Sequence, residues 1–156
     1  MEIDRGAKRG IALQDGIFAW FGFVASAAFL TFLVLKTAVY IHESDPYPES
    51  YSVICILVVV LAAAPCSFCG VKGYALSRFY GLGDKMSMFC LVPVTALITC
   101  TLAAHLALAL IADPSPALFS GLVWFGAIAF PGMFGYFYAR PAPKVQTPVD
   151  DLLPKM

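Results

Sequence analysis

Four stretches of this chain contain no charged residue, and each is long enough to cross a membrane once. They cover residues 16–35, 50–71, 86–112 and 114–139. The hydrocarbon core of a bilayer is about 30 Å thick, so a helix needs about 20 apolar residues to span it. No stretch alternates polar and apolar residues, which favours helices over a β-barrel. The sequence therefore predicts an all-α integral membrane protein whose four transmembrane helices form an antiparallel bundle.

The composition excludes several other classes of protein. Of the 156 residues, 60% are hydrophobic and only 13% are charged. An ordinary soluble domain is about 45–50% apolar and about 25% charged. The ten basic residues are balanced by ten acidic ones, so there is no excess of positive charge to neutralise phosphates. We therefore exclude a soluble globule, a disordered chain and a nucleic-acid-binding protein.

The basic residues predict the orientation in the membrane. Nine of the ten Lys and Arg residues lie before the first helix, between the second and third, or after the fourth. Because positive loops stay on the cytoplasmic side, both termini should face the cytoplasm or the mitochondrial matrix. This orientation fits a mitochondrial or a bacterial inner membrane. The first apolar run is about 25 residues long, too long for a cleaved secretory signal, so we expect a retained helix.

The predicted organisation has three parts. An N-terminal segment, 1–16, precedes a transmembrane domain, 17–139, and a Pro-rich tail, 140–156, follows it on the same side. The tail is expected to be extended. Within the domain, the expected helices cover about 17–41, 50–71, 86–112 and 115–139, with an inner loop over about 70–85.

Two outer loops resemble each other. Asp45-Pro46 recurs as Asp113-Pro114, 68 residues later. An ancestral duplication of a helical hairpin would explain this spacing. A local cause is also open, because Asp accepts hydrogen bonds from nearby backbone amides and Pro favours the start of a helix.

Small residues at intervals of four predict where the helices pack closely. In lipid, such residues let two helix backbones approach each other. The third helix should therefore be central and the first should pack through its own small pair. The residues are Thr95, Thr99, Ala103 and Ala107 on the third helix, with Gly22 and Ser26 on the first.

One group of polar residues near the outer side could bind an ion or a polar ligand. Lys36 and His105 lie at similar depths, beneath an acidic mouth that includes Asp45 and Asp113. Ionisable residues inside a membrane often mark an ion or substrate pathway. The alternative is structural: the lysine can extend to the headgroups, and the histidine can hydrogen-bond a helix backbone.

The cysteines suggest a second chemistry. Cys66 and Cys69 form a CxxC motif, which is typical of thiol redox or metal sites. With Cys90 they would supply three ligands where zinc needs four, so no metal site is expected. Free thiols that act as small packing residues are the favoured interpretation.

These observations favour a non-catalytic accessory subunit of a larger membrane complex, of an energy-transducing kind such as a respiratory complex or ATP synthase. The expected partners are membrane lipids and other membrane subunits, or further copies of this chain, with bound lipids in place of a cofactor. A small channel or transporter that uses Lys36 and His105 is one alternative. A thiol oxidoreductase that uses Cys66 and Cys69 is the other.

Overall fold

The computed structural model describes residues 2–43, 49–111 and 114–141, with side chains for 4–40, 54, 57–111 and 121–141. Its described part is helical, in four elements: α1 (Glu2–Glu43), α2 (Glu49–Tyr80), α3 (Asp84–Ile111) and α4 (Pro114–Ala139). Each of the four has a span long and apolar enough to cross a membrane. The expected loop pairs at residues 45 and 113, and the tail beyond residue 141, lie outside the described residues, and the proposed duplication rests on them.

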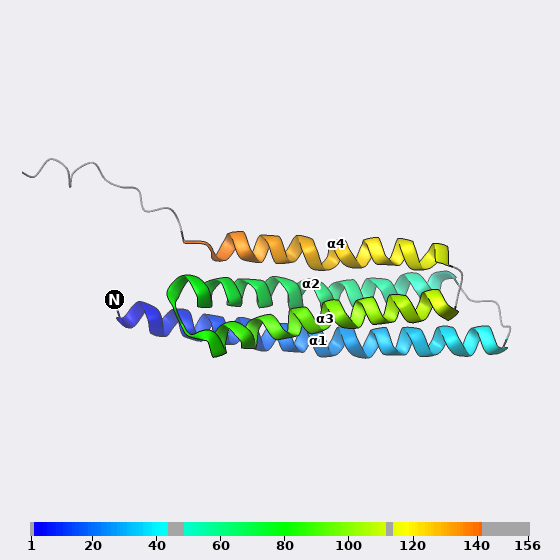
Figure 1. Ribbon diagram of the computed structural model, residues 1–156, viewed down its shortest axis with the longest axis horizontal. Helices are drawn as coiled ribbons and strands as arrows, with labels where there is room; N and C mark the ends of the chain where they lie inside the picture. Colours follow the sequence, from blue (N-terminus) through cyan, green and yellow to red (C-terminus); the bar gives the residue numbers. More distant parts are fainter. Residues whose placement is uncertain (1, 44–48, 112–113, 142–156) are drawn as a thin grey trace, which may run out of the picture.

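The four helices lie side by side along one long axis, and the chain reverses direction from each helix to the next (Figure 1). α2 packs against all three other helices, most extensively against α1 and α4. α1 and α4 lie on opposite sides of α2, with no contact between them within the described residues. α3 touches every other helix too, but only slightly on the side of α4. The central helix is therefore α2, which corrects the expectation that the third helix is central.

Three glycines explain why α2 is central. A Cβ at Gly22 of α1 would lie 2.8 Å from the Ala62 carbonyl oxygen of α2. A Cβ at Gly70 would lie 2.9 Å from the Cys90 carbonyl oxygen of α3, and one at Gly135 of α4 would meet the Phe68 carbonyl oxygen. Each contact thus brings a helix backbone within reach of α2. No other residue type leaves room for this approach on all three sides.

The small residues Gly22 and Ser26 of α1 are part of its contact with α2. Ser26 is fully buried, and its hydroxyl donates a hydrogen bond to the Gly22 carbonyl oxygen at 2.7 Å. The hydroxyl is thereby satisfied within α1 and does not need a partner from α2. Gly22 and Ser26 consequently lie where α1 meets the backbone of α2.

The small residues of α3 do not line its inner face. Thr95, Thr99 and Ala103 are exposed and Ala107 is half-buried, which corrects the expectation that they form the packing face of the bundle. The buried face of α3 consists of Cys90, Pro93, Val94, Leu97, Thr101 and Ala104, with Ser87 near its start. The Val94 side chain fills the space above Gly70 of α2, so the inner face of α3 combines branched apolar residues with other small residues.

The connection between α2 and α3 is a short turn, and the loop expected from residue 70 onward is helical as far as Tyr80. The charged residues Lys72 and Arg78 follow the apolar part of α2, and the helix continues through them. The helix ends where Gly81 and Gly83 adopt φ angles of 61° and 104°, which glycine favours. The Ser77 and Ser87 hydroxyls, 2.8 Å apart, then join the two helices across the turn. The N-terminal segment is likewise helical from Glu2.

The close approach at Gly22 predicts opposite effects for two identical substitutions. Gly22→Ala should lower the free energy of unfolding by about 1–3 kcal/mol, because the new methyl group is forced against the α2 backbone. Gly10→Ala, where a Cβ meets nothing within 4 Å, should stabilise α1 by up to about 1 kcal/mol through helix propensity. Unfolding of both variants in detergent micelles, followed by circular dichroism, measures the difference. Equal stability of the two variants would contradict the described packing.

Candidate functional site

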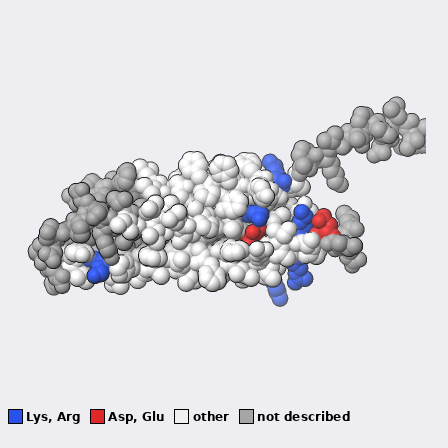
Figure 2. All heavy atoms as spheres, turned by 180° about the vertical axis from the view of Figure 1, so that it is seen from behind, with Lys and Arg blue, Asp and Glu red and all other residues white. Residues whose placement is uncertain are grey.

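A buried ion pair joins α1 and α2 toward the end of the bundle that holds the turn at residues 81–83. The Lys72 ammonium lies 3.1 Å from Asp15 Oδ1, and the two side chains are only 19% and 9% exposed, respectively. Both residues fall inside helical spans apolar enough to cross a membrane. Figure 2 shows the charged atoms of the described surface gathered mainly toward one end, with a long uncharged region beside them.

Small residues bring the two charges together. Ala12, Asp15 and Ala19 follow one another at helical spacing on the buried side of α1. Gly73 lies beside Lys72, and a Cβ there would be 3.2 Å from the Asp15 Cβ and 2.8 Å from the Cys90 sulfur. The absence of bulk on both helices therefore allows a short aspartate to reach a lysine on the neighbouring helix.

The remaining helices complete the surroundings of this pair. Cys90 of α3 donates a hydrogen bond from its thiol to the Ala12 carbonyl oxygen, over 3.3 Å. The ring of Tyr138 on α4 lies with its centroid 5.6 Å from the Lys72 ammonium, at the distance of a cation–π contact. All four helices thus contribute a group. We call Asp15, Lys72, Cys90 and Tyr138 the four-helix polar cluster.

One atom of the cluster has an unfilled hydrogen-bonding capacity. Asp15 Oδ2 is buried and meets no hydrogen-bond partner among the described residues. Burying a charge is costly, and a pair repays that cost only when its geometry and its other hydrogen bonds are good. The arrangement can hold α1 and α2 in one register. It also leaves an acceptor able to take a proton or a hydrogen bond from a small polar group.

The positions of Asp15 and Lys72 in the sequence indicate that they could pair, although hydropathy alone does not reveal this. Asp15 directly precedes the first charge-free stretch, and Lys72 directly follows the second. In a helical hairpin these two positions lie at the same depth. Hydropathy places Asp15 in the N-terminal segment and Lys72 in the inner loop, so it predicts that neither residue is buried.

The structure describes two residues of the predicted outer group, Lys36 and His105. The Lys36 ammonium lies over the ring of Tyr40, 6.0 Å from its centroid and on the same helix. His105 Nδ1 lies 2.6 Å from the Thr101 carbonyl oxygen, so this nitrogen carries the proton, and the ring faces Gly121 of α4. Lys36 thus contacts its own helix α1, whereas His105 contacts α3 and α4. The side chains of Asp45 and Asp113 lie outside the described residues.

The cysteines of α2 lie in the interior of a helix. Cys66, Cys69, Cys90 and Cys100 are free thiols. Cys66 is fully buried, and its Cβ lies 2.9 Å from where a Cβ at Gly22 would be. Reactive thiols are typically partly exposed, at the start of a helix or beside a cation. Within the described part of the chain, no three His, Cys, Asp or Glu residues are grouped so that they could hold a metal ion.

Removing one partner of the buried ion pair should cost more stability than removing both. We expect Asp15→Asn or Lys72→Met alone to lower the free energy of unfolding by about 3 kcal/mol, because the remaining group loses its partner while buried. The double variant should recover much of that loss. Arg78→Gln, which breaks the exposed Arg78–Asp84 pair, is the control and should cost less than about 1 kcal/mol. Additive losses in the double variant, measured by unfolding in micelles, would contradict the pairing.

The burial of Cys66 predicts unequal thiol reactivity. In the folded protein, Cys69 is half-buried and should be alkylated before Cys66, while both stay reduced after mild oxidation. Mass spectrometry of peptides after timed alkylation measures both outcomes. A disulfide between Cys66 and Cys69 that forms readily would instead support thiol redox chemistry.

Comparison with known proteins identifies no relative of this chain. The chain matches no protein family, and searches of curated proteins and of solved structures found no match.

Proposed function

We propose that this chain is an integral membrane protein and a non-catalytic accessory subunit of a larger membrane complex. In this proposal its four antiparallel helices cross the bilayer, and both termini face the cytoplasm or the matrix. The turn at residues 81–83 then lies on the same side as the termini. Nine of ten basic residues on that side support this orientation.

The apolar exterior supports the location in a membrane. Every helix presents large apolar side chains outward, among them Phe21 of α1, Leu61 of α2, Leu110 of α3 and Phe125 of α4. A soluble monomer rarely exposes apolar surface over such an extent, because its hydration is unfavourable. Lipid chains remove this cost, and the charged residues remain concentrated toward one end (Figure 2).

The exposed small residues of α3 are the observation that carries the assignment as a subunit. Thr95 and Thr99 bond their hydroxyls within α3, to the carbonyl oxygens of Val92 at 2.9 Å and Thr95 at 3.0 Å. With Ala103 they make a surface that a second helix can approach closely. The close backbone contacts at Gly22, Gly70 and Gly135 all lie inside the bundle and involve α2. A transmembrane helix of another subunit is the partner that fits this surface.

The state of the reactive residues supports a non-catalytic role. The buried thiols of Cys66 and Cys90 take part in packing, and His105 bonds to its own helix. Lys72 is paired with Asp15. Groups held in these contacts stabilise the bundle, and a catalytic group usually needs access to a substrate.

The size of the particle tests the proposal. Extracted in a mild detergent, the protein should migrate with partner proteins in a particle heavier than its own 16.8 kDa chain and micelle. Ala103→Phe should weaken this association by about tenfold, because the ring prevents close helix contact. Ala28→Phe, the same change at an exposed position of α1, is the matched control and should leave the particle intact. A wild-type protein that migrates alone would overturn the proposal.

A further inference from the structure

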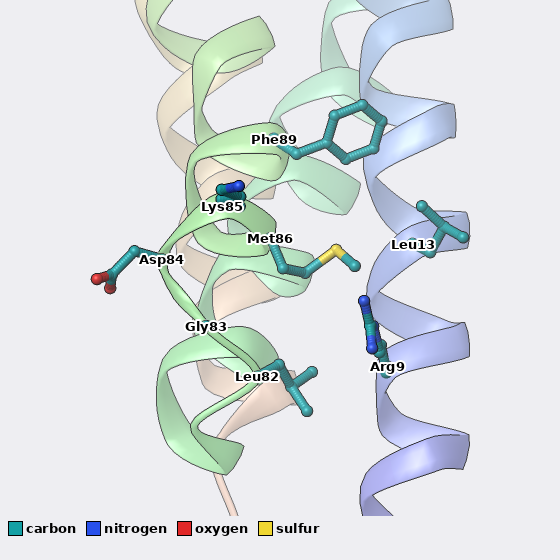
Figure 3. Close-up of a pocket in the computed structure, with 8 residues that line it drawn as sticks. All are labelled: Arg9, Leu13, Leu82, Gly83, Asp84, Lys85, Met86 and Phe89. Carbon is teal, nitrogen blue, oxygen red and sulfur yellow. The ribbon is translucent and has the colours of Figure 1, made fainter.

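A cavity of about 340 Å³ opens between α1 and the start of α3, beside the turn at residues 81–83. Two cationic residues line it, Arg9 from α1 and Lys85 from α3. Its apolar lining includes Leu13, Met86 and Phe89. Figure 3 shows Met86 and Phe89 extending across the space toward α1, where Leu13 and Arg9 lie. We call it the Arg9–Lys85 cavity.

The charge of the cavity is positive. Asp84 is the acidic residue of the described lining, and its carboxylate accepts a hydrogen bond from Arg78 at 3.3 Å. In Figure 3 the Asp84 side chain points away from the cavity. Arg9 and Lys85 thus line the cavity, while the carboxylate of Asp84 is directed elsewhere. An arginine guanidinium matches the oxygens of a phosphate, to which it can donate two parallel hydrogen bonds.

Apolar residues line the cavity on the side toward the middle of the bundle, and Leu82 lines it at the turn. Leu13 is one helical turn from Arg9 along α1, and Phe89 is one turn from Lys85 along α3. The Phe89 ring packs over Gly16, where a Cβ would be 2.6 Å from it. The Trp20 indole nitrogen donates to the Phe89 carbonyl oxygen at 3.2 Å, which ties α1 to α3 just beyond the cavity.

We propose that the Arg9–Lys85 cavity binds an anionic phospholipid, with the phosphate between the two cations and the start of an acyl chain against Leu13 and Phe89. On each of the two helices the basic residue lies one turn nearer the end of the bundle than an apolar lining residue, which is the order of headgroup and acyl chain in a bilayer. A free phosphate ion would use the cations and leave the apolar wall in contact with water. Basic pockets between transmembrane helices on the cytoplasmic or matrix side are suited to such headgroups. This inference goes beyond the role of a subunit.

Lipid retention by the full chain tests the proposal. The purified protein is incubated in detergent with phosphatidylglycerol, with phosphatidylcholine or with inorganic phosphate, and the retained molecules are counted by native mass spectrometry. The wild type should retain phosphatidylglycerol in preference to phosphatidylcholine. Each basic residue near an anionic headgroup is expected to contribute about a fivefold factor, so Arg9→Gln with Lys85→Gln should weaken retention by about thirtyfold.

The matched control removes a charge from the same end outside the cavity. Arg140 lies directly after α4, which has no contact with α1 in the described part of the chain. Arg140→Gln should retain phosphatidylglycerol within about twofold of the wild type, because a basic residue away from the headgroup contributes only a screened attraction. If the double cavity variant does not fold, Lys85→Gln alone should still show about a fivefold loss.

Three results would overturn the proposal. The first is equal retention of the two lipids by the wild type. The second is equal loss in the cavity and control variants, which would mean that no site exists. The third is displacement of phosphatidylglycerol by an equal concentration of inorganic phosphate, which would assign the cavity to a free anion.

Discussion

The approach of three helices to the backbone of α2 is the constraint on which the rest of the structure depends. Gly22, Gly70 and Gly135 provide it, one for each neighbouring helix. In lipid no hydrophobic force drives helices together, so close van der Waals contact has to supply much of the association. Once α2 occupies the centre, α1 and α4 are separated on its two sides, and α3 closes the bundle against both α1 and α2.

This packing also decides where the charged groups meet. The hairpin of α1 and α2 brings Asp15 and Lys72 to one depth, and the small residues around them shorten the gap to 3.1 Å. A buried charge pair contributes little net stability, but its separation would leave each charge unpaired. It therefore opposes any slip of α1 along α2. The exposed Arg78–Asp84 pair lies at the α2–α3 turn in a setting where solvent weakens the attraction.

α3 carries both surfaces to which we assign partners. Its inner face is filled by Val94, Leu97 and their neighbours, so the small residues Thr95, Thr99 and Ala103 remain outside. Its first turn borders the Arg9–Lys85 cavity, where basic and apolar residues are arranged in the order of a lipid. The two surfaces differ in chemistry, and both proposals depend on the location of the chain in a membrane. The groups inside the bundle, by contrast, are occupied with packing and pairing.

The sequence by itself determined that the chain has four helices able to cross a membrane, because length and hydropathy are properties of consecutive residues. It did not determine the helix ends, since α2 continues through Lys72 and Arg78 until two glycines in left-handed conformations end it. Only the tertiary structure decided that α2 is central, that Thr95 and Thr99 face outward, and that Asp15 meets Lys72. The physical reason is that a helix apolar on every side has no marked inner face. Its orientation follows from the backbone atoms and side chains of the neighbouring helix, which are distant in the sequence.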